Sequence, residues 1–351
     1  MTFDLDKLVR ENVKNLVPYS SARKEFAGAA EIFLDANENS FGSPTANSYN
    51  RYPDPLQTKI KEQIAVWKKL SPQQIFIGNG SDEAIDLLFR VFCQPARDEI
   101  ITTPPTYGMY EVSANINDVS VKKVLLTPDF KLEAEKVLGA VSENTKLIFL
   151  CSPNNPTGNN LDGKAVLQIL KNFNGIIVVD EAYADFSDKP SFVREIENHP
   201  NLVVLQTFSK AWGLAGLRVG MAFASAEIIL LLNKVKPPYN VSQIAQEALL
   251  AALDKKPEVE RVVREIIKQR EFLAAELDEL SFVTRIYPSD ANFLLIKTVD
   301  VNAVYNHLVE QKIVVRNRTN VELCAGCLRI TVGTPEENSI LLSALSSYKD
   351  N

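Results

Sequence analysis

The chain has 351 residues, of which 46% are hydrophobic and 23% are charged, so it carries enough apolar material for a large buried core. The net charge of −6 at pH 7, without a block of Lys and Arg, argues against partners such as nucleic acid or an anionic membrane. The start, MTFDLDKLVRENVKNL, lacks the apolar core of a signal peptide, and no apolar run approaches the roughly 20 residues of a spanning helix. We therefore expect a cytoplasmic protein.

Short apolar runs alternate with amphipathic, helix-period segments between residues 74 and 224. Several runs are continuous rather than alternating, which is typical of strands that are covered on both faces of a parallel sheet. We predict strands at 74–78, 98–103, 146–151, 176–180, 201–208 and 218–224, with helices such as 81–92 and 164–173 between them. The alternation predicts an α/β fold with a mostly parallel central sheet covered by helices.

The pattern changes near residue 236, where KPPYN interrupts the chain and two long helical segments follow. Beyond them we predict strands at 281–287, 292–298, 312–316 and 327–333, and helices at 301–311 and from Pro335. We therefore divide the chain into a large domain, 46–240, and a smaller α+β domain, 241–351. We expect the segment 1–45, with a lone strand EIFLDAN at 31–37, to pack with the smaller domain, because chain ends often lie close together.

The motif C-A-G-C, formed by Cys324 and Cys327, has a spacing found in redox and zinc sites. Structural zinc takes four ligands, and the chain has four cysteines, two histidines and no second C-x-x-C. We therefore interpret these cysteines as buried structural residues and predict no metal site. Two histidines also leave little material for Ser-His-Asp or Cys-His catalysis.

Ligands of open α/β sheets bind beyond the carboxyl ends of the strands, so the residues that follow each run are candidates. The turn around Gly80 opens a helix, and such an end binds anions, although a plain capped helix is an alternative. Asp180 ends a buried strand, where a carboxylate needs a cation or a strong donor. It could cap the next turn or hold a protonated heterocyclic nitrogen. The loop SPNNPTG is either a simple turn or a pair of amides placed for a ligand.

Lys210 lies in QTFSKAWGLAGLRVG, among small, aromatic and hydroxylated residues. A solvated surface lysine is the ordinary alternative. Among apolar neighbours, however, the pKa of a lysine falls, and its amine can form a Schiff base. Hydroxyls and a fixed guanidinium nearby, as in Thr207, Ser209 and Arg218, suit a phosphate. An aldehyde, a pyridine nitrogen and a phosphate occur together in pyridoxal 5'-phosphate.

The motifs PNNPTG, DEAYADF and TFSKAWGLAGLRVG, in this order, resemble those of the fold-type I aminotransferases. The motifs LDANENSFGSP, RYPDP, NGSDEAID and CLRITVGT narrow the resemblance to the histidinol-phosphate aminotransferase group. It extends from about Pro18 to the C-terminal helix. The resemblance implies a large cofactor-binding domain, a smaller α+β domain, and a homodimer with shared active sites.

The resemblance also implies roles for individual residues. Lys210 forms the Schiff base and moves the proton, and Asp180 keeps the pyridine nitrogen protonated. Tyr183 and Asn155 form hydrogen bonds with the phenolic oxygen of the cofactor ring. The loop that carries Asn155 has a cis Asn155–Pro156 bond. Tyr107 stacks on the ring. The phosphate contacts are Gly80, Ser81, Asp82, Thr207, Ser209, Arg218 and, from the other subunit, Tyr52. The substrate-binding positions are Tyr19, Asn37, Arg316 and Arg329.

The implied reaction is a ping-pong transamination. Glutamate gives its amino group to the cofactor and leaves as 2-oxoglutarate, and the pair histidinol phosphate and imidazole-acetol phosphate completes the cycle. Two arginines suit a pocket that receives a carboxylate and a phosphate in turn. Alternatives within the fold are a threonine-phosphate decarboxylase and a broad aromatic-amino-acid aminotransferase. A ligand-binding module of a DNA-binding regulator would need an added basic helix-turn-helix segment, for which we find no room in these residues.

Overall fold

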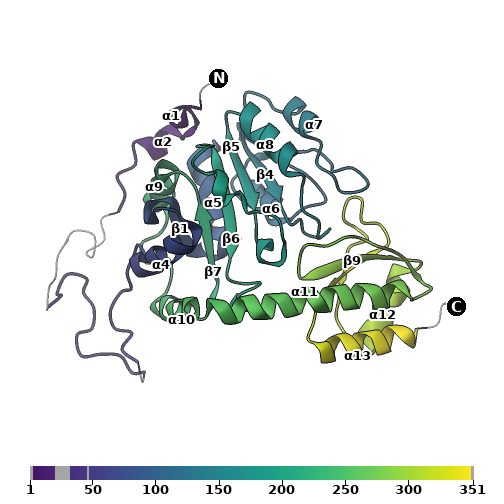
Figure 1. Ribbon diagram of the computed structural model, residues 1–351. Coiled ribbons are helices and arrows are strands. Elements are labelled where there is room, and N and C mark those ends of the chain that lie inside the picture. Colours follow the sequence, from purple (N-terminus) through teal and green to yellow (C-terminus); the bar gives the residue numbers. More distant parts are fainter. Residues whose placement is uncertain (1–2, 20–31, 46, 349–351) are drawn as a thin grey trace.

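The computed structural model describes residues 3–19, 32–45 and 47–348 and contains two sheets (Figure 1). The larger sheet has the strand order β1-β7-β6-β5-β4-β2-β3. Only β7 runs against its neighbours, so the predicted mostly parallel sheet is confirmed. The strands, in sheet order, are β1 (Ile75–Asn79), β7 (Val219–Phe223), β6 (Leu202–Thr207), β5 (Ile176–Asp180), β4 (Thr145–Cys151), β2 (Glu99–Thr102) and β3 (Ser120–Lys123).

Helices cover both faces of this sheet because successive residues of each buried strand point to opposite sides. One face packs α4 (Thr58–Lys68), α7 (Ala134–Gly139), α8 (Gly163–Asn172) and α10 (Gln243–Leu253). The other face packs α5 (Gly80–Phe92), α6 (Met109–Ile116) and α9 (Ala226–Val235). In β5, for example, Ile177 and Val179 join the first core, whereas Ile176 and Val178 join the second.

The smaller sheet is antiparallel, with the order β10-β11-β9-β8. Its strands are β8 (Val283–Ile286), β9 (Phe293–Thr298), β10 (Arg316–Asn317) and β11 (Cys327–Thr331). It shares a separate core with the second half of α11 (Lys256–Asp278) and with α12 (Val301–Glu310) and α13 (Pro335–Ser346). Figure 1 shows α11 running from the larger layer to this smaller α+β unit. No helix among the described residues is long and apolar enough to cross a membrane.

The described N-terminal residues differ from the expectation. Helices α1 (Leu5–Leu8) and α2 (Glu11–Lys14) lie against the larger layer, not the smaller domain. Val9 and Val13 are buried in the core that contains α5 and α9, and the Arg10 N–H donates to the Val91 carbonyl at 3.0 Å. The physical reason is that packing these two valines against the core of α5 and α9 removes their apolar surface from water. The predicted pairing of this segment with the smaller domain is therefore corrected for residues 3–14.

Two further predictions require correction. Residues 32–37 form no strand, and Ile32 and Leu34 are 77% and 81% exposed, because no sheet edge lies beside them to complete the backbone hydrogen bonds. Of the predicted strand 312–316 only the last residue is paired, in β10. Helix α10, placed after the predicted boundary at 240, packs into the larger core. The exact domain boundaries stay a prediction.

Candidate active site

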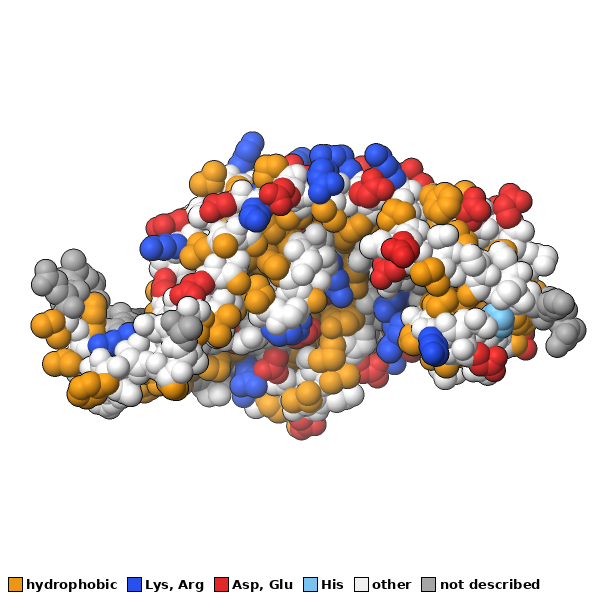
Figure 2. Space-filling view, turned by 90° about the horizontal axis from the view of Figure 1, so that it is seen from below, with side chains coloured by type: hydrophobic (Ala, Val, Ile, Leu, Met, Phe, Trp, Pro, Cys, Tyr) orange, Lys and Arg blue, Asp and Glu red, His pale blue; other side chains and the backbone are white. Residues whose placement is uncertain are grey.

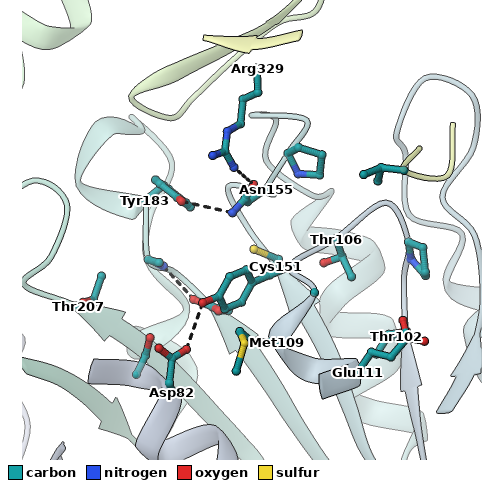
Figure 3. A pocket seen from close by; sticks show the side chains of 18 of the residues that line it. Asp82, Thr102, Thr106, Met109, Glu111, Cys151, Asn155, Tyr183, Thr207 and Arg329 are labelled. Carbon is teal, nitrogen blue, oxygen red and sulfur yellow. Dashed lines mark hydrogen bonds between the residues drawn. The ribbon is translucent and has the colours of Figure 1, made fainter. Parts of the chain in front are cut away.

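A cavity of about 580 Å³ lies where the carboxyl ends of β4, β5 and β6 meet the start of α5, and the β10–β11 hairpin closes one side (Figure 3). This is the edge at which ligands of open α/β sheets bind. Thirteen of the predicted site residues line it: Gly80, Ser81, Asp82, Tyr107, Asn155, Asp180, Tyr183, Thr207, Ser209, Lys210, Arg218, Arg316 and Arg329.

Lys210 follows β6 and points its amine into this cavity, with Nζ 5.5 Å from the centre of the Tyr183 ring. Solvent reaches the side chain through the cavity, but the surrounding protein removes part of its hydration. This desolvation lowers the pKa of Lys210, and the positive charges of Arg329 and Arg218 lower it further. A larger share of the amine is therefore neutral and nucleophilic near pH 7 than in a solvated lysine.

Asp180 is the buried last residue of β5, and its carboxylate accepts two hydrogen bonds. The Tyr110 hydroxyl donates at 2.7 Å and the Ala182 N–H donates at 3.1 Å. Burial raises the pKa of Asp180 to about 6, and the two hydrogen bonds counteract that rise. Lys210 also acts on the charge of Asp180, but Asp180 forms no ion pair with any described residue. A protonated heterocyclic nitrogen in the cavity would supply such a partner.

An anion cradle lies at the start of α5. Gly80 has φ = 72°, a conformation that strains any residue with a Cβ, and a Cβ there would also lie 2.8 Å from Nη2 of Arg218 and displace the guanidinium. Arg218 makes long contacts of 3.4 Å with Asp82 and with the Ser209 hydroxyl. Thr207 donates to Ser209 at 3.1 Å. Free N–H groups of the helix, two hydroxyls and a loosely held guanidinium suit a phosphate.

On the side of the cavity opposite the anion cradle, a series of contacts connects the two domains. Arg329 donates to Oδ1 of Asn155 at 2.5 Å, and Nδ2 of Asn155 donates to the Tyr183 hydroxyl at 3.4 Å (Figure 3). The Asn155–Pro156 bond is cis, which confirms the prediction for this loop. Tyr107 donates to Asp82 at 3.2 Å, so its ring is held at the mouth of the cradle. These side chains leave one open space between the cradle and Arg329.

Three predicted residues lie elsewhere. Tyr52 stacks on Tyr239 with ring centres 4.4 Å apart, and it lines a second pocket together with Asn37. Tyr19 is 75% exposed and lines neither pocket. Within one chain these side chains are not brought to Lys210, and their predicted roles stay predictions.

Other residues of the site were missed from the sequence. Tyr110, three residues after Tyr107 in PTYGMY, is fully buried and bonds Asp180. Arg318 lines the cavity beside Arg316, and the alternation R-N-R at the end of an apolar run could have indicated it. Cys324 and Cys327 are buried free thiols, and no metal-binding group of His, Cys, Asp and Glu occurs within the described ranges.

Comparison with known proteins agrees with this architecture, which is that of the fold-type I aminotransferases. The family model for aminotransferase class I and II matches residues 30–345, and the chain belongs to this family. It is 57% identical over 346 residues to the histidinol-phosphate aminotransferase of Parabacteroides distasonis, covering 99% of each chain. It is 54% identical to that of Cytophaga hutchinsonii, covering 99% of this chain and 100% of the relative.

A solved structure extends the comparison to the cofactor. The histidinol-phosphate aminotransferase from Sinorhizobium meliloti, in complex with pyridoxal-5'-phosphate, superimposes with a TM-score of 0.79 at 25% identity, over 88% of each chain.

Proposed function

We propose that this chain is a pyridoxal-phosphate-dependent aminotransferase that exchanges an amino group between glutamate and histidinol phosphate. The products are 2-oxoglutarate and imidazole-acetol phosphate. The observation that supports it most is that Lys210, Asp180 and the phosphate cradle line one cavity whose facing wall carries arginines. The names of relatives that are more than half identical over nearly the whole chain support the same substrates.

The residues present fit the cofactor. When bound, pyridoxal phosphate supplies an electron sink for breaking the substrate's Cα–H bond. The Lys210 amine would hold the aldehyde carbon, and once released it would take the proton from the substrate and return it. Asp180 would pair with the ring nitrogen, and the cradle around Gly80 and Arg218 would hold the phosphate.

The remaining residues would orient the reactants. Nδ2 of Asn155 lies 3.4 Å from the Tyr183 hydroxyl. Both side chains would form hydrogen bonds with the phenolic oxygen of the cofactor ring. Arg316 and Arg329 would bind the anionic end of each substrate in turn, because a guanidinium fits a carboxylate and a phosphate through the same pair of N–H groups. Tyr107 would cover one face of the ring.

Removal of the Lys210 amine tests this mechanism. Borohydride should attach the cofactor permanently to the peptide that contains Lys210, as mass spectrometry would detect. Lys210→Ala should lose at least about 100-fold in turnover, because it removes the general base and acid. The exposed Lys171→Ala is the matched control and should keep wild-type turnover. A Lys210→Ala protein as fast as wild type would contradict the mechanism.

A second assay separates transamination from decarboxylation, the alternative within the fold. The protein is incubated with glutamate and imidazole-acetol phosphate, and the 2-oxoglutarate formed is measured. We expect stoichiometric 2-oxoglutarate and histidinol phosphate. Release of carbon dioxide from threonine phosphate, with no 2-oxoglutarate from the first pair, would favour the decarboxylase.

We also infer a homodimer with shared sites and a cytoplasmic location. In support, Tyr52 and Asn37 lie away from Lys210, and the segment that carries them exposes Leu34 and Phe41. Figure 2 shows hydrophobic side chains gathered on the surface at the left end of the molecule. Such an apolar surface favours association. A two-fold interface would bring Tyr52 of each subunit to the phosphate of its mate. Cell fractionation with an activity assay tests the location. Activity in the membrane or secreted fraction would contradict a cytoplasmic location.

Mixed dimers test the shared site. Tyr52→Phe and Lys210→Ala subunits, unfolded and refolded together, should form dimers in which one site has both residues intact and the other has neither. The mixture should therefore exceed the activity of either variant alone. Ultracentrifugation at assay concentration is the companion measurement, and a fully active monomer would refute the inference.

A further inference from the structure

The β10–β11 hairpin turns three guanidiniums toward the cavity. Arg316 is opposite Arg329 in the antiparallel register, and the Arg318 N–H donates to the Cys327 carbonyl at 2.9 Å, which extends the register by one pair. Residues two apart on a strand, and residues opposite each other on neighbouring strands, share a face. All three arginines accordingly line the cavity.

These charges are not compensated within the described part of the chain. None of the three arginines forms an ion pair with a described carboxylate, and the acceptor for Arg329 is the neutral amide of Asn155. Glu111 and Glu322, which also line the cavity, are both paired with Lys123, at 2.9 Å and 3.2 Å. These two acidic side chains therefore already have a cation.

Within the described ranges, Arg318 carries a hydrogen-bond donor that has no acceptor. Its Nε is buried and has no hydrogen-bond partner among the described residues. Burial lowers the pKa of Arg318, and the charge of Arg316 lowers it further. Burial likewise lowers the pKa of Arg329, and the charge of Arg318 lowers it further. Mutual repulsion of this kind, with a buried donor unsatisfied, is costly unless an anion enters.

A phosphate can form hydrogen bonds and ion pairs with more guanidiniums than a carboxylate can. A carboxylate offers two oxygens and one negative charge, which a single bidentate arginine can satisfy. A phosphate monoester offers three terminal oxygens and a charge of about −1.5 to −2 at pH 7. We propose that Arg318 is a specificity-determining residue, by which the cavity prefers a substrate that ends in a phosphate monoester. This proposal rests on the proposed function.

The experiment compares histidinol phosphate with histidinol, which lacks the phosphate, as amino donors to 2-oxoglutarate. Arg318→Gln should reduce kcat/KM for histidinol phosphate by about 10- to 100-fold, the range expected for a lost charge-assisted hydrogen bond. It should change kcat/KM for histidinol and for glutamate by less than about 3-fold, since these lack the phosphate that Arg318 is proposed to contact. The specificity is measured by the ratio of kcat/KM for histidinol phosphate to kcat/KM for histidinol, rather than by either value alone.

Two further variants control for structure and charge. Arg264→Gln removes an exposed arginine of α11 and should leave the ratio unchanged. Arg318→Lys keeps the charge without the planar fork and should keep part of the preference. Direct binding is measured by displacement: inorganic phosphate should inhibit the wild-type holoenzyme at a concentration at least about 10-fold lower than it inhibits Arg318→Gln.

The outcomes are distinguishable. If the wild type transaminates histidinol phosphate and Arg318→Gln leaves the donor ratio and phosphate inhibition unchanged, the proposal is overturned and the proposed function stands. An equal fall for both donors also overturns it, because that result indicates a structural role. If the wild type does not use histidinol phosphate at all, the proposed function fails and the proposal fails with it.

Discussion

A neighbouring hydroxyl favours the ionised form of Asp180. Burial disfavours its ionised form, and the hydrogen bond from Tyr110 is the largest effect that opposes burial. Tyr110 is itself fixed, since it is fully buried and stacks on Phe149 with ring centres 4.6 Å apart. Tyr110 thus acts as a positioning residue that keeps the carboxylate ionised and aimed into the cavity.

Tyr110→Phe should raise the pKa of Asp180, which is about 6, because a contribution that lowers it is lost. The carboxyl would then hold its proton to higher pH, and the acid limb of the rate profile should move upward by about 1 unit. Infrared titration of the protonated carboxyl band in the cofactor-free protein checks this.

The band is assigned by its absence in Asp180→Asn, and Tyr305→Phe in α12 controls for the loss of a hydroxyl elsewhere. An unchanged titration in Tyr110→Phe would show that backbone donors alone set this pKa.

At the level of single residues, the sequence predicted the groups that follow buried strands. Lys210, Asp180 and Asn155 were singled out because each follows an apolar run at the sheet edge where ligands bind, although each had a structural alternative until the motifs indicated the family. Tyr110 was not found, because an aromatic residue on an amphipathic helix is indistinguishable from core. Arg318 was missed since an arginine after a strand resembles a solvated charge until the register is known.

Among the elements, the start of α5 and strand β7 approach each other unusually closely. A Cβ on Gly220 would lie 2.2 Å from the backbone nitrogen of Ser81 and 2.3 Å from the carbonyl carbon of Gly80. Real Cβ atoms do not approach backbone so closely, so any side chain must push the helix away from the strand. The position of the cradle for the phosphate therefore depends on two glycines, Gly80 of α5 and Gly220 of β7.

Gly220→Ala should lower the free energy of unfolding by about 1–3 kcal/mol, as overpacked sites do, and should weaken cofactor retention. Denaturant unfolding and fluorescence titration with pyridoxal phosphate measure the two effects. Gly216→Ala is the matched control nearby, because its Cβ would meet nothing within 4 Å. Equal stability and equal affinity of the two variants would show that β7 can move without cost.

Six of the seven strands of the central sheet were predicted to within about one residue, since continuous apolar runs bounded by turns mark buried strands clearly. The edge strand β3 was not predicted, because its sequence SVKK is short, polar and only partly buried. Prediction failed for residues 32–37 and for most of 312–316, whose apolar residues face solvent or pack without pairing. A strand at an edge depends on a neighbour that lies far away in the sequence, and its own composition does not supply that information.

For the whole molecule, Lys123 joins the two domains at the rim of the cavity. It extends from β3 to Glu111 of α6 and to Glu322 of the loop between β10 and β11. The loop that precedes β11 is thereby held against the larger domain. Exposed ion pairs contribute about 0–1 kcal/mol each, so the link is weak enough to open.

Lys123→Met should raise KM for both substrates by about 2- to 5-fold at low salt, because the hairpin is held less often in place. The difference from wild type should shrink at high salt, where the ion pairs are screened. Lys122→Met is the control, as its contacts with Glu99 and the Ala140 carbonyl stay within the larger domain. A salt-independent effect would point to packing of the lysine stem instead.

Helix α11 gives this arrangement a mechanical property. About a third of the way along it, Val263 packs in one small cluster with Tyr183 and Phe293. The centre of the Phe293 ring lies 5.2 Å from that of Tyr183 and 5.3 Å from the Arg329 guanidinium. Its 23 residues form a rod about 35 Å long. From Val263 to its C-terminal end the helix extends about 22 Å, so a rotation of about 5° about Val263 would move that end by about 2 Å. A small rotation of α11 about the Val263 cluster is therefore expected to change the distance between Arg329 of the smaller unit and Asn155 of the larger one.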